Sequence, residues 1–140
     1  MVVDLHGANH TGQELELMLQ GRKPLAWFGF VEDSDAELIA ECERKFEDHV
    51  KTGRLVKCAY SEELACDPRL GRKLKGKTLL YALPNEAWRI SAMRLALKVN
   101  GTLSRQNGPG PDEAIDRMIG ALLGYSDEEM DAYIAAGKYR

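Results

Sequence analysis

The sequence predicts a small α+β domain, with one mixed sheet of about three or four strands, flanking helices and a helical hairpin at the C-terminal end. Three patterns predict it: a strand, helix and strand in succession over residues 24–60, a further strand followed by a long helix, and two linked helical patterns over residues 112–136. With 140 residues, 44% of them hydrophobic, the chain fits one domain, 1–140. We expect a flexible N-terminus at residues 1–10 and a hinge loop at residues 100–111 before the hairpin.

The first helix is marked by the sequence TGQE, in which Thr11 is the expected N-cap and Glu14 stands three positions later, the pattern of a capping box. Gly21 is expected to end this helix, because glycine adopts the left-handed conformation at little cost. The run PLAWFGFV follows at residues 24–31. Its length and its aromatic and β-branched composition indicate a buried strand.

The second helix is predicted by apolar residues at helical spacing, with charged residues on the opposite face. Ser34 or Asp35 is expected to cap it, and Gly53 to end it. The apolar positions are Leu38, Ile39, Cys42, Phe46 and Val50. Alternation over RLVKCAY, residues 54–60, predicts the next strand. This succession is a βαβ unit, which puts its two strands parallel.

Residues 61–76 carry a proline and two glycines without a stable period, and we expect a surface connection with about one helical turn. The run KTLLYAL, residues 77–83, predicts the third strand. Asn85 is the expected cap of the helix that follows. An apolar stripe predicts that this helix is largely buried, and its members are Trp88, Ala92, Leu95 and Val99.

The closing stretch reads as two amphipathic helices that meet at Gly124, with a second capping box from Ser126 to Glu129. This outline matches a helix-turn-helix, whose second helix would place basic and amide side chains in the major groove of DNA. Here the second helix begins with SDEEMD, whose acids would repel phosphates and suit the positive end of the helix dipole. We therefore expect a plain helical hairpin and no binding to DNA.

The uninterrupted apolar runs are far shorter than the roughly 20 residues of a membrane helix, and the first residues lack the pattern of a secretory signal. We therefore expect no membrane span and a cytoplasmic location. The cysteines Cys42, Cys58 and Cys66 include no C-x-x-C pair, which argues against a disulfide framework and a thiolate zinc site. We interpret them as reduced thiols.

Charge is uneven along the chain. The formal net charge is −3, yet residues 61–110 hold nine basic and four acidic side chains. The basic residues concentrate in RLGRKLKGK, a composition that suits phosphates, an acidic partner or RNA; the alternative is a solvated loop. If this loop folds over the start of the helix after the third strand, Arg89 extends the same patch. The candidate anion- or partner-binding residues are Arg69, Arg72, Lys73, Lys75, Lys77 and Arg89.

Other chemistry-bearing groups give weaker patterns. His6 and His10 have the spacing of two zinc ligands on a helix, but the glycine and asparagine between them disfavour a helix, so we expect no metal site and no cofactor. Cys66 lies near Arg69 in the sequence, without a histidine that is obviously available as its base. The carboxylates after the first strand, Glu32, Asp33 and Asp35, suit a helix cap better than acid or base chemistry.

These observations favour a binding or regulatory module that acts through protein–protein interaction. The apolar faces of the C-terminal hairpin either pack on the sheet or meet another subunit, which leaves a homodimer open. The second hypothesis is an enzyme for a phosphate-bearing or other anionic small molecule, held at the basic loop, with chemistry from Cys66 or one of the carboxylates Glu32, Asp33 and Asp35. RNA binding through the basic loop at residues 69–77 is the third. The sequence does not identify catalytic residues.

Overall fold

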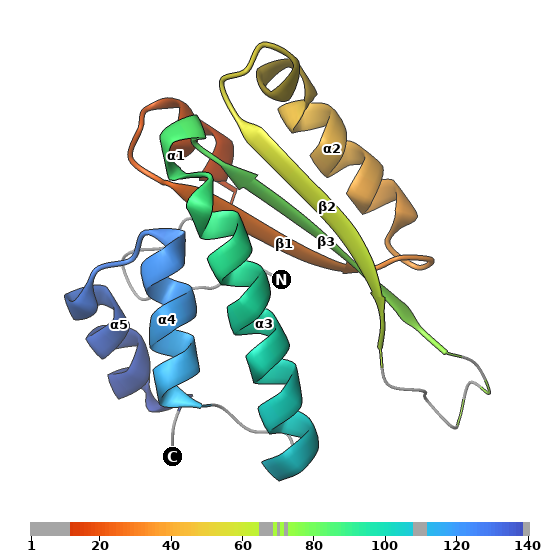
Figure 1. Ribbon diagram of the computed structural model, residues 1–140, viewed down its shortest axis with the longest axis vertical. Coiled ribbons are helices and arrows are strands. Elements are labelled where there is room, and N and C mark those ends of the chain that lie inside the picture. The colour runs from red at the N-terminus through yellow and green to blue at the C-terminus, as the bar shows by residue number, and fades with distance from the viewer. Residues whose placement is uncertain (1–11, 65–68, 70, 72, 108–111, 139–140) are drawn as a thin grey trace.

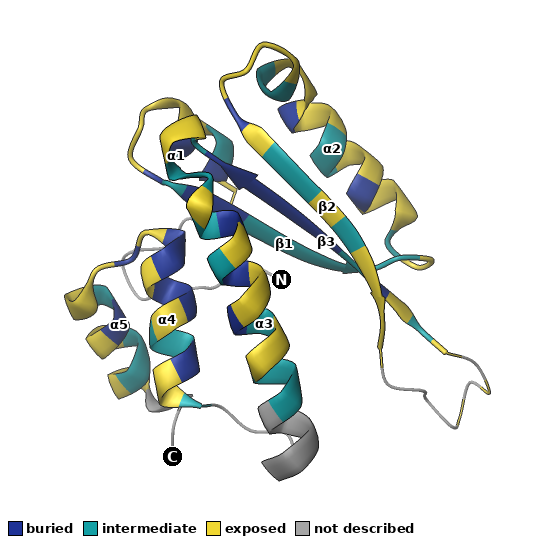
Figure 2. Cartoon of the chain, viewed as in Figure 1, coloured by how far each residue is buried: buried dark blue, intermediate teal, exposed yellow. Residues whose placement is uncertain are grey.

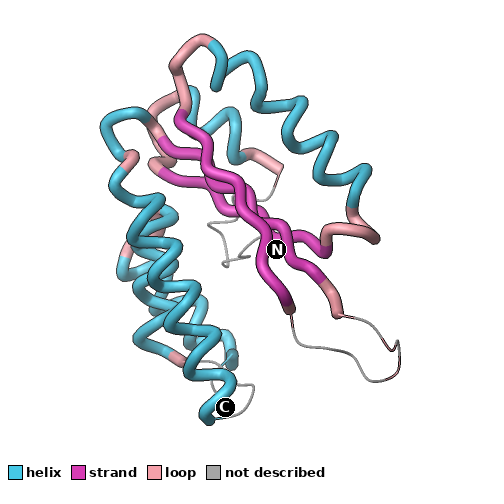
Figure 3. The backbone as a smooth tube through the Cα atoms, turned by 45° about the vertical axis from the view of Figure 1, so that its right-hand side comes forward, coloured by secondary structure: helices cyan, strands magenta, loops and turns pink. Residues whose placement is uncertain are grey.

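The computed structural model describes residues 12–64, 69, 71, 73–107 and 112–138, which form a three-stranded sheet between two layers of helices (Figures 1 and 3). Helices α1 and α2 cover one face of the sheet, and α3, α4 and α5 lie on the other side. The elements in chain order are α1 (Glu14–Leu19), β1 (Leu25–Val31), α2 (Ala36–Lys51), β2 (Val56–Glu63), β3 (Lys75–Ala82), the 3₁₀ helix Pro84–Glu86, α3 (Trp88–Asn107), α4 (Glu113–Leu123), α5 (Asp127–Tyr133) and the π-helix Ile134–Lys138. The predicted α+β class and the C-terminal hairpin are confirmed.

The sheet has the strand order β1-β3-β2, and β3 is antiparallel to both of its neighbours. β1 and β2 therefore run in the same direction, as the predicted βαβ succession requires. They are not adjacent, because the chain folds back after β2 as a hairpin and places β3 between them. The described sheet is therefore antiparallel in its pairings rather than mixed.

Alternate residues of the strands feed two hydrophobic cores, one on each face of the sheet. On the α2 side, the rings of Phe46 and Tyr81 stack with their centroids 4.1 Å apart. On the other side, Leu80 packs with Met93 of α3 and Ile119 of α4. Burying one such side chain contributes roughly 1.5–3 kcal/mol. Figure 2 shows that β3 is buried along most of its length, whereas much of β2 is exposed.

The beginnings of α1 and α2 differ from the expected caps. Gln13 occupies the N-cap of α1, while Thr11 lies outside the described residues. Glu14, which was expected in a capping box, is buried. Asp35 is the N-cap of α2, but its carboxylate accepts a hydrogen bond from the Val31 N–H, at 2.8 Å, rather than from the helix. The bond closes the turn that follows β1.

Strands β2 and β3 extend into both ends of the region 61–76, which was expected to be a surface connection, and residues 65–68, 70 and 72 lie outside the described residues. β2 continues to Glu63 and β3 begins at Lys75, and the Leu64 N–H donates to the Leu74 C=O at 2.7 Å beyond both strand ends. The sequence analysis missed this extension because the proline, the two glycines and the lack of a stable period over residues 61–76 pointed to a loop. The acidic side chains at the end of β2 stay in water on this edge strand, so they do not interrupt the ladder.

The face of α3 that meets the sheet is not the predicted one. Ile90 and Met93 are buried, whereas Trp88 is 59% exposed, Leu95 is 63% exposed and Val99 is also exposed. The prediction that the stripe from Trp88 to Val99 is buried is therefore wrong. Both faces of α3 are apolar, so periodicity alone does not determine which of them packs against the sheet.

The C-terminal hairpin follows its predicted signals closely. α3 runs to Asn107, which is later than the expected start of the hinge, and residues 108–111 lie outside the described part. Gly124 ends α4 with a φ of 96°. The predicted capping box is confirmed, since the Glu129 N–H donates to Ser126 Oγ at 3.1 Å and the Ser126 N–H donates to Glu129 Oε1 at 2.9 Å. No helix among the described residues combines the length and hydropathy needed to cross a membrane.

Candidate functional site

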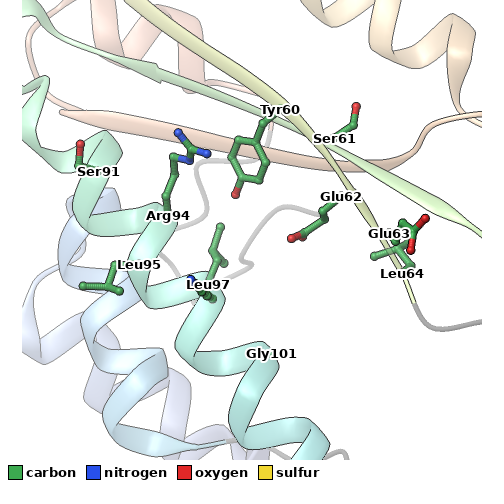
Figure 4. A pocket seen from close by; sticks show the side chains of 11 residues that line it. Tyr60, Ser61, Glu62, Glu63, Leu64, Ser91, Arg94, Leu95, Leu97 and Gly101 are labelled. Carbon is green, nitrogen blue, oxygen red and sulfur yellow. The ribbon is translucent and has the colours of Figure 1, made fainter.

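A groove lies between α3 and the edge strand β2. It consists of two adjoining hollows of about 800 and 410 Å³, which share Glu62, Leu64, Leu97 and Gly101 in their linings, and we call them together the β2–α3 groove. α3 and the sheet separate toward the C-terminal end of α3 (Figures 1 and 3), and the groove occupies this opening. Figure 4 shows the larger hollow, with side chains from β2 on one side and from α3 on the other.

Small residues make the floor of the groove deep. Gly29 of β1 and Gly76 of β3 line the smaller hollow together with Thr78, so three neighbouring positions of the sheet offer little side chain to fill it. Gly76 also has a packing role, because a Cβ at this position would lie 3.1 Å from the Leu64 side chain. Trp27 lines the same hollow, and its buried indole N–H has no hydrogen-bond partner among the described residues.

The two walls of the groove carry opposite charge. On the α3 side, Arg94 and Lys98 are exposed and line the larger hollow. The sequence of α3 contains no acidic residue. On the β2 side, Glu62 and Glu63 line the same hollow. The larger hollow therefore has a basic wall on α3 and an acidic wall on β2.

Arg94 joins the two walls by lying over Tyr60 of β2. The guanidinium carbon is 4.5 Å from the centre of the tyrosine ring, a cation–π contact visible in Figure 4. Burial raises the pKa of Tyr60, while its hydrogen bond with Thr78 and the charge of Arg94 act in the opposite direction. The phenol therefore stays neutral at physiological pH and remains able to donate and accept hydrogen bonds.

β2 has a free edge on the side of this groove. Within the described residues it pairs only with β3, and the bond from Leu64 N–H to Leu74 C=O shows that the even-numbered residues of β2 direct their backbone groups toward β3. The residues whose backbone N–H and C=O point away from the sheet are therefore Lys57, Ala59, Ser61 and Glu63. Ser61 and Glu63 also line the groove. An open row of backbone donors and acceptors is a template for a further strand.

The predicted basic residues lie mainly on the hairpin of β2 and β3. Lys75 and Lys77 are in β3, and Lys77 lines the smaller hollow. Lys73 forms an exposed ion pair with Glu63 of β2, and Lys73 Nζ lies 3.7 Å from Glu63 Oε2. Arg69 is exposed, and Arg72 lies outside the described residues. Exposed pairs of this kind contribute about 0–1 kcal/mol to stability.

Arg89 is not brought together with this hairpin. α3 starts close to the end of β3, whereas the hairpin precedes the start of β3, so the two lie at opposite ends of the strand (Figure 1). Arg89 Nη1 donates to the C=O groups of Ala121 and Leu122, at 3.0 and 3.1 Å, and Arg89 Nε lies 2.8 Å from Glu86 Oε2. These carbonyls form the negative end of α4, which a cation stabilises. Arg89 thus joins α3 to α4, contrary to the idea of an extended anion site.

The carboxylates after β1 have structural partners. Asp35 closes the turn at Val31, and Glu32 Oε1 accepts a hydrogen bond from Ser61 Oγ at 3.1 Å. Asp35 lines the smaller hollow together with Lys77, whereas Glu32 and Asp33 line neither hollow. Of the arrangement expected for an enzyme, with these carboxylates and the basic residues around one cavity, the groove contains Asp35 beside Lys77 and lacks Glu32 and Asp33.

The remaining candidates do not assemble into a second site within the described part of the chain. Cys66, His6 and His10 lie outside it. Burial raises the pKa of the Cys42 thiol to about 11, so this cysteine is a neutral, poorly nucleophilic group. No cluster of three or more histidine, cysteine, aspartate or glutamate side chains that could hold a metal occurs among the described residues.

Sequence reasoning missed the groove because its parts come from distant segments. Arg94 and Lys98 are four positions apart and therefore share one face of a helix, which is the signal that could have indicated a basic wall. Tyr60 stood at the predicted end of its strand, so nothing marked it as part of a groove. A comparison with protein family models, curated proteins and solved structures finds no match to this chain.

Proposed function

We propose that the protein is a binding module that accepts an extended segment of a polypeptide as an added strand beside β2. The observation that carries this proposal is the coincidence of the free edge of β2 with the β2–α3 groove. In recognition by strand addition, main-chain hydrogen bonds supply affinity, and pockets beside the strand select alternate side chains of the guest. The groove and the edge supply these two parts together.

The groove predicts the chemistry of the guest strand. Guest side chains on the α3 side would meet Arg94 and the ring of Tyr60, which favours acidic or apolar residues at alternate positions. Guest side chains on the opposite face would lie beside Lys57, which forms an ion pair with Glu43 of α2. A guest with basic residues toward α3 would be repelled by Arg94 and Lys98.

Affinity requires both the edge and the groove. Each main-chain hydrogen bond contributes a net of about 0.5–1.5 kcal/mol, so the outward backbone groups of four residues supply a few kcal/mol, much of which the ordering of the guest consumes. Side-chain contacts in the groove must therefore supply a large part of the selectivity. This is why the proposal depends on Arg94 as well as on the backbone of β2.

The test is selection from a displayed library of extended peptides on protein immobilised so sparsely that its copies cannot meet. Selected peptides should protect the amide protons of the outward residues of β2 from hydrogen exchange. Ala59→Pro should abolish binding, because proline removes an outward N–H while a proline on an edge strand leaves the ladder to β3 intact. Ala59→Val keeps the N–H and is the matched control.

Two results decide the matter. Acidic or apolar alternating peptides whose binding is lost in Ala59→Pro and retained in Ala59→Val support strand addition. Selected peptides that bind Ala59→Pro as tightly as the wild type, or that protect amides elsewhere, overturn it.

A further inference from the structure

We infer that one strand suited to the free edge of β2 is β2 of a second copy of this chain, paired antiparallel to form a symmetric dimer. The inference rests on the proposed function, the addition of a strand beside β2, and identifies the added strand. It derives from the sequence of β2 itself, VKCAYSEE, which has a basic residue near one end and acidic residues at the other. An antiparallel pair of such strands brings unlike ends together.

The free backbone groups restrict the register. Only the odd-numbered residues of β2 direct their backbone groups away from the sheet. Each hydrogen-bonded pair between the two copies must therefore consist of two odd-numbered residues. In the register centred on Tyr60, Ala59 lies opposite Ser61 of the second copy, and Lys57 lies opposite Glu63 of the second copy. Both relations occur twice because the two-fold axis passes between the two Tyr60 residues.

Charge selects this register over its neighbours. A shift that centres the pair on Ala59 places Lys57 opposite Ser61, and a shift that centres it on Ser61 places Glu63 opposite Ala59, so neither aligns opposite charges. The Tyr60-centred register forms two pairs of Lys57 with Glu63, and directly opposed unlike charges favour strand pairing. Lys57 also contacts Glu43 of α2 on the same face of the sheet, and the 3.7 Å contact of Glu63 with Lys73 of its own copy is an exposed pair that contributes little.

The α3 wall favours the same arrangement. In the Tyr60-centred register, Glu62 of the second copy lies opposite Cys58, one row from Tyr60 and on the sheet face that Arg94 covers. An acidic side chain there matches the chemistry that Arg94 and Lys98 select. The three-stranded sheets of the two copies would then form one continuous sheet, with both α3 helices on the same side.

The first test is the oligomeric state of the full chain by native mass spectrometry and by light scattering after gel filtration. The wild type should be a dimer at micromolar concentration. Ala59→Pro should be a monomer with an unchanged circular dichroism spectrum, and Ala59→Val should remain a dimer. A wild type that stays monomeric, or an Ala59→Pro variant that stays dimeric, overturns the inference.

The second test exchanges the charges. Glu63→Lys opposes Lys57 with a lysine, and Lys57→Glu opposes Glu63 with a glutamate, so each variant alone should raise the dimer dissociation constant about tenfold or more. When the two variants are mixed, with one labelled with nitrogen-15, both contacts in the mixed dimer regain unlike charges. The mixed dimer should therefore dominate, whereas random mixing would overturn the register.

The inference and the proposed function can fail separately. A monomeric wild type that binds selected peptides at β2, with the binding lost in Ala59→Pro, refutes self-pairing and leaves strand addition standing. A wild type that neither dimerises nor binds such peptides refutes both. A dimer that Ala59→Pro leaves intact uses another surface, and self-pairing through β2 is then wrong.

Discussion

The two edge strands of the sheet, β1 and β2, differ in what lies against their outer backbone groups. At β1, the Val31 N–H donates to Asp35 Oδ2 at 2.8 Å and the Val31 C=O accepts from the Asp35 N–H at 2.9 Å, so the turn into α2 satisfies the last outward residue of this edge. At the start of β1, Pro24 lies against Gly124 at the end of α4. β2 has neither a turn nor a helix end on its outer edge within the described residues, and it faces a groove instead.

Under the proposed function, this difference makes the open edge of β2 a selective binding edge. Native proteins guard edge strands with charged residues, and β2 carries Lys57, Glu62 and Glu63. On the proposal of strand addition, these charges should repel a guest strand of like charge pattern and attract one whose charges alternate in the opposite sense. β1, by contrast, has the uncharged sequence LAWFGFV. The predictions below break or sharpen this comparison, beginning with the largest effect.

The largest effect on stability is expected where the end of α4 contacts the residue before β1. Gly124 has a φ of 96°, and a Cβ there would lie 2.6 Å from Cδ of Pro24, a rigid ring. Gly124→Ala should therefore lower the free energy of unfolding by about 2–4 kcal/mol, through backbone strain and overpacking. Urea denaturation measures it. The control is Gly53→Ala, since Gly53 has a φ of 77° but no neighbouring atom within 4 Å. Equal losses in both variants would refute the role of the contact with Pro24.

A pH-dependent effect is expected at Lys23, which also joins the start of β1 to α4. Its Nζ donates to the Leu123 C=O at 3.0 Å, and burial lowers its pKa from 10.5 to about 8. Between these two pH values the unfolded chain holds a proton that the folded protein has lost, so stability rises with pH across the window. The gain is of the order of 3 kcal/mol at most, reached near the upper end of the window.

The measurement is the free energy of unfolding of the wild type and Lys23→Met between pH 8 and 10.5. The wild type should gain stability relative to the variant as pH rises. Cys42, whose pKa burial raises to about 11, acts in the opposite direction, but it is present in both proteins and cancels in the difference. A difference that does not change with pH would contradict the buried position of the Lys23 ammonium group.

A smaller effect is expected at the closed end of the β1 edge. Asp35→Ala removes the acceptor of the Val31 N–H and should cost about 1–3 kcal/mol. It should also leave the Val31 N–H unpaired at the end of the β1 edge, so light scattering should detect more self-association than in the wild type. Asp35→Asn keeps a side-chain oxygen that can accept the same bond, and should behave more like the wild type. Self-association of Asp35→Ala equal to that of the wild type would contradict this account of the closed edge.

The fold was largely predictable from local signals, and the errors occurred where tertiary contacts decide. The Ser126 capping box and the break at Gly124 were predicted correctly, because both depend on a few adjacent residues. The buried face of α3 was not, because the choice between two apolar faces depends on how Met93 meets the sheet. The position of β3 between β1 and β2 likewise depends on long-range pairing rather than on any local pattern.

The candidate site was less predictable than the fold. The basic composition of the region from Arg69 to Lys77 drew attention to the hairpin of β2 and β3, but not to the free edge of β2. Arg89 has the same charge as Arg94, yet one binds the carbonyl groups at the end of α4 and the other covers Tyr60. Composition cannot distinguish these roles, because they depend on which face of α3 each residue occupies.

The smallest effect on stability is expected at Arg94. Its contact with Tyr60 is exposed to solvent, so Arg94→Ala should change the free energy of unfolding by about 1 kcal/mol or less. The same variant should raise the pKa of Tyr60 further, because the arginine's charge lowers it, and ultraviolet titration of the phenol measures this. It should also weaken the binding of acidic guest peptides more than the binding of neutral ones. Arg89→Ala removes an equal charge from the contact with α4, so it should destabilise the fold more and change the preference for acidic guests less. The opposite ranking of the two variants would show that the basic wall of the groove does not select the guest.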